Sequence, residues 1–266
     1  MNKIKTLFAK KNPLGTALGI LLSLIFWCII WYLASLIYAK PLLLPAPTMV
    51  FPRVFKLIFS ARFWTYMLRT SFTLLLGYIA GSVLGLLLGI FTAKSRLLDL
   101  LFTPIFSILR ATPVACFIII AWVFLGSAKL PAVIAALMVA PVMMTNVATG
   151  VRSAQKELLE ASSVLRLSLW DKIRVVYFPA LLPHLTSGLV ISAGLAWKSG
   201  IAAEVIALSA DTLGFAVYEA KSWTMDVVEL FALTILIAIF ALLGESLLSF
   251  ALKLLARRKE KHRANH

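Results

Sequence analysis

The sequence predicts an all-α, polytopic membrane helical bundle with six transmembrane helices, and three observations lead to this prediction. The 266-residue chain is 61% hydrophobic and only 14% charged, and its mean hydropathy is +0.96. Soluble domains are closer to half apolar and a quarter charged, so much of this apolar surface must face lipid. The apolar residues form long runs without the alternation that is typical of strands, which indicates helices rather than a barrel.

Six apolar stretches approach or exceed the roughly 20 residues that a helix needs to cross the hydrocarbon core. They are Leu14 to Tyr38, Ser71 to Ala93, Pro104 to Leu125, Pro131 to Thr149, Leu185 to Leu208 and Val228 to Leu252. We therefore divide the chain into a basic cytoplasmic N-terminus (1–13), a transmembrane domain (14–253) and a basic cytoplasmic tail (254–266). The first stretch is too long for the core of a signal peptide, and no small-residue cleavage site follows it.

The basic residues predict the orientation of these helices. The net charge of +15 would suggest nucleic acid in a soluble chain, but most Lys and Arg residues lie between the apolar runs, where they encode topology. With both termini in the cytoplasm, 17 of them fall on that side and 7 on the other. The first external segment holds five of the seven, and its stretch Pro52 to Ser60 is typical of an interfacial helix. We predict an N-in, C-in membrane protein that binds no nucleic acid.

The sequence offers no site for metal or for catalysis. Cys28 and Cys116 both lie inside apolar stretches, so they predict neither a disulfide framework nor a zinc site. The chain contains no His-Glu-x-x-His motif and no pair of carboxylates within a span. We therefore expect no catalytic residues and no metal ligands.

Four glycines form a stripe along the second apolar stretch. Gly77, Gly81, Gly85 and Gly89 recur every four residues, which places them on one face of a helix. Helices in lipid associate through the close approach of small residues, so the stripe predicts a tight helix–helix contact. The contact lies either within the subunit or across a dimer, and we interpret it as internal packing.

The cytoplasmic segment from Gly150 to Pro183 is too long for a simple turn. Its first half predicts a helix with Leu158, Ala161 and Leu165 on one face, followed by a break near Arg166 and Leu167. An ordinary solvated loop is the alternative.

A second short helix is predicted after this break. Ser168, with Asp171 three residues later, has the pattern of a capping box. Pro179 and Pro183 are expected to end the helix and to lead into the next span.

This segment resembles the coupling motif of ABC-importer permeases, which reads Glu-Ala-Ala, three residues, Gly, nine residues, Ile, any residue, Leu-Pro. The matching positions are Glu160, Ala161, Ser162, Arg166 in place of Gly, Val176, Phe178 and Pro179. Further stretches are similar to the nitrate/sulfonate/taurine-type branch. They are Leu44 to Thr48, Leu109 to Pro113, Ala196-Trp197 with Ala202 to Glu204, and Leu213-Gly214.

The resemblance implies a type I ABC-importer-like (MetI-like) transmembrane domain whose segment 150–183 docks in a groove of a cytoplasmic ATPase. Glu160 would contact that ATPase or cap the helix, Ala161 and Ser162 would pack closely, and Pro179 would fix the exit angle. Arg166 departs from the pattern. Glycine adopts a left-handed backbone at such a corner freely, whereas other residues adopt it at a free-energy cost of about 1 kcal/mol.

The resemblance also implies the partners. This chain has no phosphate-binding loop, so ATP and Mg²⁺ would bind to two copies of a separate ATPase, and the chain itself would hold no cofactor and be no enzyme. We expect a homodimer in the bacterial inner membrane, supplied by a periplasmic or lipid-anchored solute-binding protein. The solute would be a small anion such as a sulfonate, taurine or nitrate, or a compound like a vitamin precursor. The alternatives are an ion-coupled secondary transporter and a membrane docking or assembly factor.

Polar side chains within the spans are candidates for the translocation pathway. Lys198 lies near mid-depth, where a cation is unfavourable unless it faces a cavity or a partner, and a structural pair is the alternative. Glu204 is expected near the external surface, facing a gate or the binding protein, or as a simple interfacial carboxylate. Trp197, Asn146 and Met143 complete the candidates, although methionine ordinarily serves packing.

Overall fold

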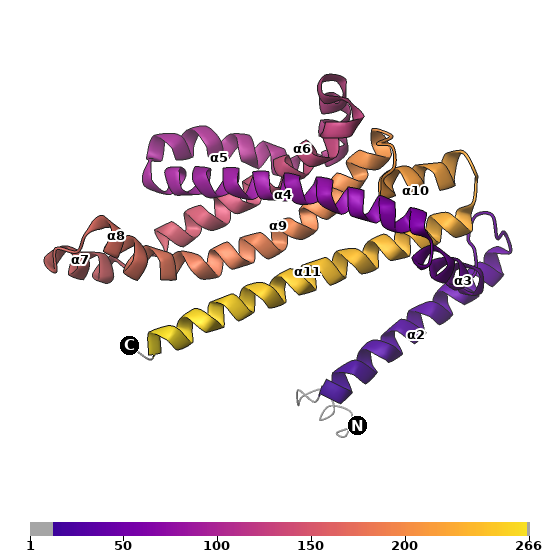
Figure 1. The fold of residues 1–266 in the computed structure, drawn as a ribbon, viewed down its shortest axis with the longest axis horizontal. Coiled ribbons are helices and arrows are strands. Elements are labelled where there is room, and N and C mark those ends of the chain that lie inside the picture. The colour runs from indigo at the N-terminus through magenta and orange to yellow at the C-terminus, as the bar shows by residue number, and fades with distance from the viewer. Residues whose placement is uncertain (1–12, 265–266) are drawn as a thin grey trace. The chain divides into compact units, whose positions relative to one another are not determined.

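The computed structural model describes residues 13–264, which form helices joined by short connections. Figure 1 shows them as a succession of helices without strands in the described part of the chain. The basic residues that precede Pro13 lie outside the described residues. The elements are α2 (Pro13–Tyr38), α3 (Pro47–Ile58), α4 (Ala61–Lys94), α5 (Arg96–Ala111), α6 (Val114–Arg152), α7 (Lys156–Val164), α8 (Leu169–Lys172), the π-helical η1 (Ile173–Tyr177), α9 (Phe178–Ile206), α10 (Leu213–Ser222) and α11 (Val227–Ala264).

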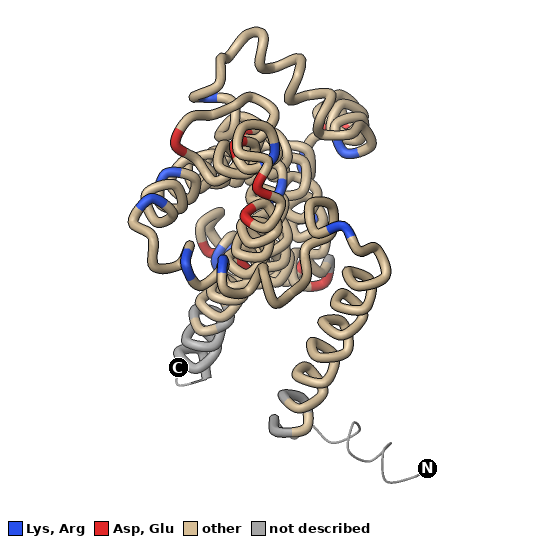
Figure 2. The backbone as a smooth tube through the Cα atoms, turned by 90° about the vertical axis from the view of Figure 1, so that its right-hand side faces the viewer, with Lys and Arg blue, Asp and Glu red and all other residues tan. Residues whose placement is uncertain are grey.

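The predicted all-α membrane bundle is confirmed. Among the described residues, five helices are long and apolar enough to cross a bilayer. They are Leu18–Tyr38, Ala61–Lys94, Val114–Arg152, Leu169–Ile206 and Val227–Leu252. Figure 2 shows α2 as a helix without charged positions along its described length. The number of six spans stays a prediction.

The predicted third span, Pro104 to Leu125, is not one continuous helix. α5 ends at Ala111, Thr112 takes an extended conformation, and α6 begins at Val114. Pro113 explains the break, because proline lacks an N–H and disfavours the helical conformation of the residue before it. The chain then turns at Gly126, whose φ of 67° and ψ of 170° are not helical. Glycine adopts such values without the steric penalty of a Cβ, so the chain can turn at Gly126, between the third and fourth apolar stretches.

The described helices divide into two compact units. The first contains the chain up to Ser60 and Glu219–Ile235. In it, the Trp31 ring stacks on Phe231 with 5.9 Å between ring centroids. The predicted interfacial helix belongs to this unit as part of α3, but it begins at Pro47, because proline suits the first turn of a helix. Arg53 of α3 forms ion pairs with Asp226 and, at 3.4 Å, with Glu229.

The second unit contains Ala61–Tyr218 and the chain from Leu236 onward. In it, α4, α6 and α9 pack against one another, and α5 folds back along α4 (Figure 1). The four glycines of α4 face α6 within this unit. A Cβ on Gly77 would lie 2.2 Å from the carbonyl oxygen of Ala132, and one on Gly85 would lie 2.5 Å from the Cβ of Met143. Only glycine allows the two backbones to approach this closely.

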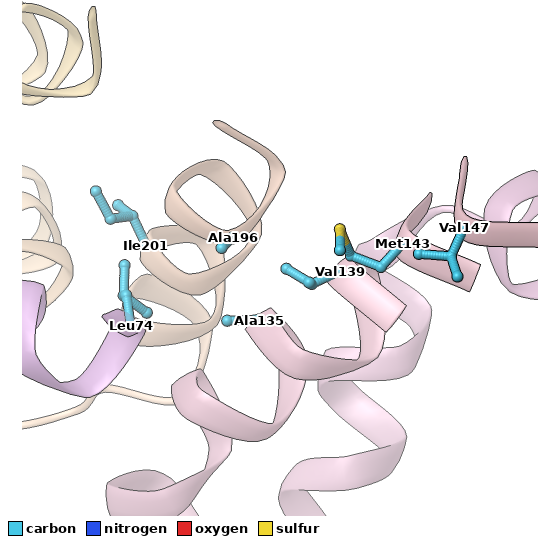
Figure 3. Packing of buried hydrophobic residues seen from close by; sticks show 7 residues of the cluster. All are labelled: Leu74, Ala135, Val139, Met143, Val147, Ala196 and Ile201. Carbon is cyan, nitrogen blue, oxygen red and sulfur yellow. The ribbon is translucent and has the colours of Figure 1, made fainter. Parts of the chain in front are cut away.

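A hydrophobic cluster lies where the three helices meet (Figure 3). It consists of Leu74 from α4, Ala135, Val139, Met143 and Val147 from α6, and Ala196 and Ile201 from α9. This cluster fixes how α9 sits against α4 and α6, and so it positions the polar residues of α9.

Candidate functional site

The segment that resembles the coupling motif forms two short helices joined by a tight corner. α7 ends with Leu165 as its C-cap, and the N–H of Leu167 donates to the carbonyl of Ser162 at 3.0 Å. The N–H of Arg166 donates to the carbonyl of Ser163 at 3.1 Å, which completes a Schellman motif. Arg166 has a φ of 51° and therefore occupies the left-handed position itself. The corner has the geometry that glycine favours, although this chain carries arginine there.

The second helix begins as its sequence predicts. The Ser168 hydroxyl accepts a hydrogen bond from the N–H of Asp171 at 3.2 Å and donates one to the Asp171 carboxylate at 2.6 Å. Lys172 adds a hydrogen bond of 3.2 Å to the Ser163 hydroxyl, which connects the second helix to the first. The corner is therefore held from both sides.

The two prolines do not end the second helix, contrary to the prediction. α8, η1 and α9 follow without interruption, so that Leu169–Ile206 forms one long helical span. Pro179 is the second residue of α9, and Pro183 lies inside it. A proline within a helix has no N–H to donate and clashes with the carbonyl four residues earlier. The π-helical turn Ile173–Tyr177 lies where that carbonyl falls for Pro179, and its wider turn accommodates the ring.

The coupling segment exposes apolar side chains. Leu158 and Leu165 of the predicted apolar face are 49% and 70% exposed, and Leu169 and Trp170 are more exposed still. Glu160 and Ala161 are also exposed, whereas Ser162 is buried and donates to the carbonyl of Leu159. These apolar side chains form an unpartnered surface in the described part of the chain.

Glu204 is buried among α4, α9 and α10, so it is not an exposed interfacial carboxylate, and its position near the external surface of the membrane stays a prediction. Its residue exposure is 0%, and its Oε2 accepts hydrogen bonds of 3.0 Å from the Thr70 hydroxyl and from the N–H of Gly214. The Thr70 hydroxyl in turn accepts a hydrogen bond of 3.0 Å from the N–H of Leu213. Glu204 thus connects the end of α9 to α4 and to the start of α10. The other oxygen, Oε1, has no hydrogen-bond partner among the described residues.

The other candidates for the pathway lie in different surroundings. Lys198 is exposed on α9, while the indole N–H of Trp197 donates to the carbonyl of Ile237 at 3.3 Å. Asn146 donates to the carbonyl of Val142 within α6 and lies beside Gly188 of α9. Met143 is 1% exposed in the central cluster, so its side chain serves packing. The structure does not gather these residues into one polar site.

Two basic residues absent from the candidates connect α5 to α6. Arg110 donates to the Thr145 hydroxyl at 3.2 Å, and Arg152 pairs with Asp99 at 2.8 Å and donates to the carbonyl of Thr92 at 2.9 Å. The signal that could have found Arg110 is a periodic one, because Thr103 and Ser107 share one helical face with it in an otherwise apolar stretch.

This chain is similar to known transport permeases. The profile of the family described as "Binding-protein-dependent transport system inner membrane component" matches residues 81–261. The taurine transport system permease protein TauC of Escherichia coli (strain K12) is 29% identical over 81% of this chain and 80% of its own. The putative aliphatic sulfonates transport permease protein SsuC of Bacillus subtilis (strain 168) is 27% identical over 95% of this chain and 90% of its own. The nitrate import permease protein NrtB of Synechocystis is 26% identical over 95% of this chain and 96% of its own.

Solved structures share the fold. The crystal structure of a bacterial ABC transporter involved in the import of the acidic polysaccharide alginate matches 91% of this chain and 95% of its own, with a TM-score of 0.59 and 17% sequence identity. An amino acid ABC transporter crystallised with histidines matches 85% of this chain with a TM-score of 0.53.

Proposed function

The chain belongs to the family of binding-protein-dependent transport system inner membrane components, and we propose that it carries a small anion inward as a homodimer bound to two ATPase subunits. Its substrate is delivered by an external solute-binding protein. ATP and Mg²⁺ bind to the separate ATPase, and this chain provides the path through the membrane.

The exposed coupling segment supports the ATPase as a partner. Leu158, Leu165, Leu169 and Trp170 present an apolar surface on short helices whose corner is fixed by hydrogen bonds. Exposed apolar patches of this kind mark interaction sites. Because α8, η1 and α9 form one helical span, a movement imposed at this surface would pass into α9 as a rigid displacement.

Dimerisation follows from the number of coupling segments. Each chain carries one such segment, and an ATPase that works as a pair requires two. A second copy of this chain supplies the second segment with no further component, which is why we favour a homodimer over a pair of different permeases.

The orientation follows from the position of the coupling segment between α6 and α9. A segment that docks on a cytoplasmic ATPase lies on the cytoplasmic side, so α6 ends there and α9 begins there. The excess of basic residues on this side agrees with N-in and C-in termini.

The anionic substrate is supported by relatives and by charge. Three relatives are named as permeases for taurine, aliphatic sulfonates and nitrate, and each of these solutes carries an anionic oxygen group. Lys198 is exposed on α9 and has no ion pair among the described residues. A cation in a span is unfavourable in lipid, so this face of α9 suits an aqueous path for anions.

The test is native mass spectrometry of the complex purified by a tag on this chain, after co-expression with the ATPase and binding-protein genes that neighbour its own. Two copies of this chain with two copies of the ATPase are the expected result. Recovery of this chain without a co-expressed ATPase would contradict the proposal. Uptake that follows an ion gradient and continues without ATP would favour a secondary transporter instead.

A further inference from the structure

A lane of polar side chains lies between α5 and α6 in the second unit. It consists of Asp99, Thr103, Ser107 and Arg110 on α5 and Thr145, Thr149 and Arg152 on α6. We call these seven residues the polar lane, and none of their side chains is buried.

The polar lane is a regular structure on two helices. Its members recur every three or four residues, so they share one face of each helix. At one end the Asp99 carboxylate accepts hydrogen bonds of 2.8 Å from Thr103 and from Arg152. At the other end Arg110 donates to Thr145 at 3.2 Å. Hydrogen bonds therefore join the two helices at both ends of the polar lane.

We infer from the lengths of the helices that Arg110 lies within the membrane rather than at its surface. α5 returns beside α4, a 34-residue span, and begins only one residue after it. Arg110 is fourteen residues beyond Arg96, or about 21 Å along α5, within a hydrocarbon core of about 30 Å. An exposed guanidinium at this depth is strongly unfavourable against lipid, so it faces water or a partner. Of these two, the row of non-buried hydroxyl and charged side chains beside Arg110 favours water, so we assign the polar lane to an aqueous path.

The charge of Arg110 is not neutralised within the described residues. Asp99, the acid of the polar lane, pairs with Arg152, and no described carboxylate forms an ion pair with Arg110. The Thr145 hydroxyl uses one of the five guanidinium donors and fixes the direction of the group. The remaining donors form a planar fork on the exposed side. Such a fork matches the paired oxygens of a carboxylate, sulfonate or nitrate group.

We propose that Arg110 is a binding site for the oxyanion group of the transported solute, at a second position along the pathway from Lys198. This inference rests on the proposed function and deepens it, because it assigns anion recognition to a residue of this chain. Thr145 is the positioning residue that holds the guanidinium in the path.

The test compares Arg110→Gln with the unchanged chain in proteoliposomes that contain the full complex and its binding protein. Radiolabelled taurine, methanesulfonate and nitrate are the probes. The maximal uptake rate of the transported anion should fall about tenfold or more, since a charge-assisted hydrogen-bonded contact is lost. The KM should stay unchanged, because the external binding protein sets it. The subunit composition of the complex should also be the same.

Arg96→Gln is the matched control. It removes the same charge from the other end of the same helix, at an exposed position outside the polar lane. Uptake should be unchanged in this variant. Arg110→Lys keeps the charge but removes the fork, and its uptake rate should lie between those of Arg110→Gln and the unchanged chain.

Unchanged uptake by Arg110→Gln, or an equal loss in Arg96→Gln, would overturn the proposal. If the Arg110→Gln variant does not assemble with the ATPase, the Arg110→Lys variant provides the test. An uptake rate of Arg110→Lys equal to that of the unchanged chain would refute the need for the guanidinium fork. Absence of an ATPase from the complex would instead count against the proposed function. The comparison of variants by uptake tests Arg110 whatever drives transport.

Discussion

The hydroxyl of Thr70 on α4 donates a hydrogen bond to the carboxylate of Glu204 on α9, across 134 positions of the sequence. Both residues are fully buried, and the same hydroxyl accepts a hydrogen bond from the N–H of Leu213. One threonine thus satisfies two partners from separate elements. A buried donor or acceptor that loses its partner destabilises a protein by about 1–3 kcal/mol.

Thr70→Val should therefore lower the free energy of unfolding by about 1–3 kcal/mol, because it leaves the N–H of Leu213 without a partner and Glu204 with only the hydrogen bond from the N–H of Gly214. Thr70→Ser keeps the hydroxyl and is the control. Thermal unfolding of the purified chain in detergent measures the difference. Equal melting temperatures for the valine and serine variants would contradict the role of this hydroxyl.

Gly85→Ala should destabilise the packing of α4 on α6. The added Cβ would lie 2.5 Å from the Cβ of Met143 and 2.6 Å from the carbonyl oxygen of Ala140. We expect a loss of about 1–3 kcal/mol, as for other overpacked cores.

Gly244→Ala is the control for this substitution, since no heavy atom lies within 4 Å of its Cβ position on α11. Alanine favours a helix by about 1 kcal/mol over glycine, so this variant should be as stable as the original or more so. Equal melting temperatures for the Gly85→Ala and Gly244→Ala variants would contradict the close contact of α4 and α6 at Gly85.

Arg166→Gly should stabilise the corner of the coupling segment. The residue has a φ of 51°. Glycine adopts this left-handed conformation without the strain of roughly 1 kcal/mol that a residue with a Cβ incurs. Arg166→Ala keeps the strain and removes the same side chain, so it is the matched control. Limited proteolysis of the segment should cut the glycine variant more slowly than the alanine variant. Faster cleavage of the glycine variant would show that the corner is not left-handed.

Glu160→Lys should weaken assembly with the ATPase, because it reverses an exposed charge on the proposed docking surface. Glu157→Lys makes the same change in the first turn of α7 and serves as the control. Co-purification of the ATPase with each variant measures the effect. An intact complex in the Glu160 variant would refute its role in docking.

Asp99→Asn should destabilise the chain at neutral pH but not in strong acid. Asp99 lies in the first turn of α5, outside the five apolar spans, and the hydrogen bond from Thr103, with a further contribution from Arg152, lowers its pKa. A carboxyl with a lowered pKa stabilises the folded state above its ordinary pKa near 4, and this contribution is lost as the pH falls through the lowered value.

The measurement is the melting temperature of both proteins between pH 7 and pH 2. The difference between the original chain and Asp99→Asn should be largest at pH 7 and should disappear at the acid end. A difference that did not change with pH would show that the charge of Asp99 contributes nothing.

The sequence by itself determined the features that depend on local patterns and on composition. Long apolar runs predict membrane helices because burial in lipid requires about 20 apolar residues, whatever surrounds them. The capping pair Ser168 and Asp171 also acts locally, since a side chain caps the backbone three residues away. The break in the helix near Arg166 likewise depends on residues that are close to it in the sequence.

Only the tertiary structure decided the surroundings of the polar residues. Glu204 has the same sequence context whether it faces solvent or the interior, and its burial depends on Thr70 and Gly214, which reach it only through the packing of α4, α9 and α10. Pro179 is likewise ambiguous, because a proline stops a helix unless a wider turn accommodates it. The periodic polar face of α5 is present in the sequence, but its contact with α6 is not, since contacts between distant segments leave no local signal.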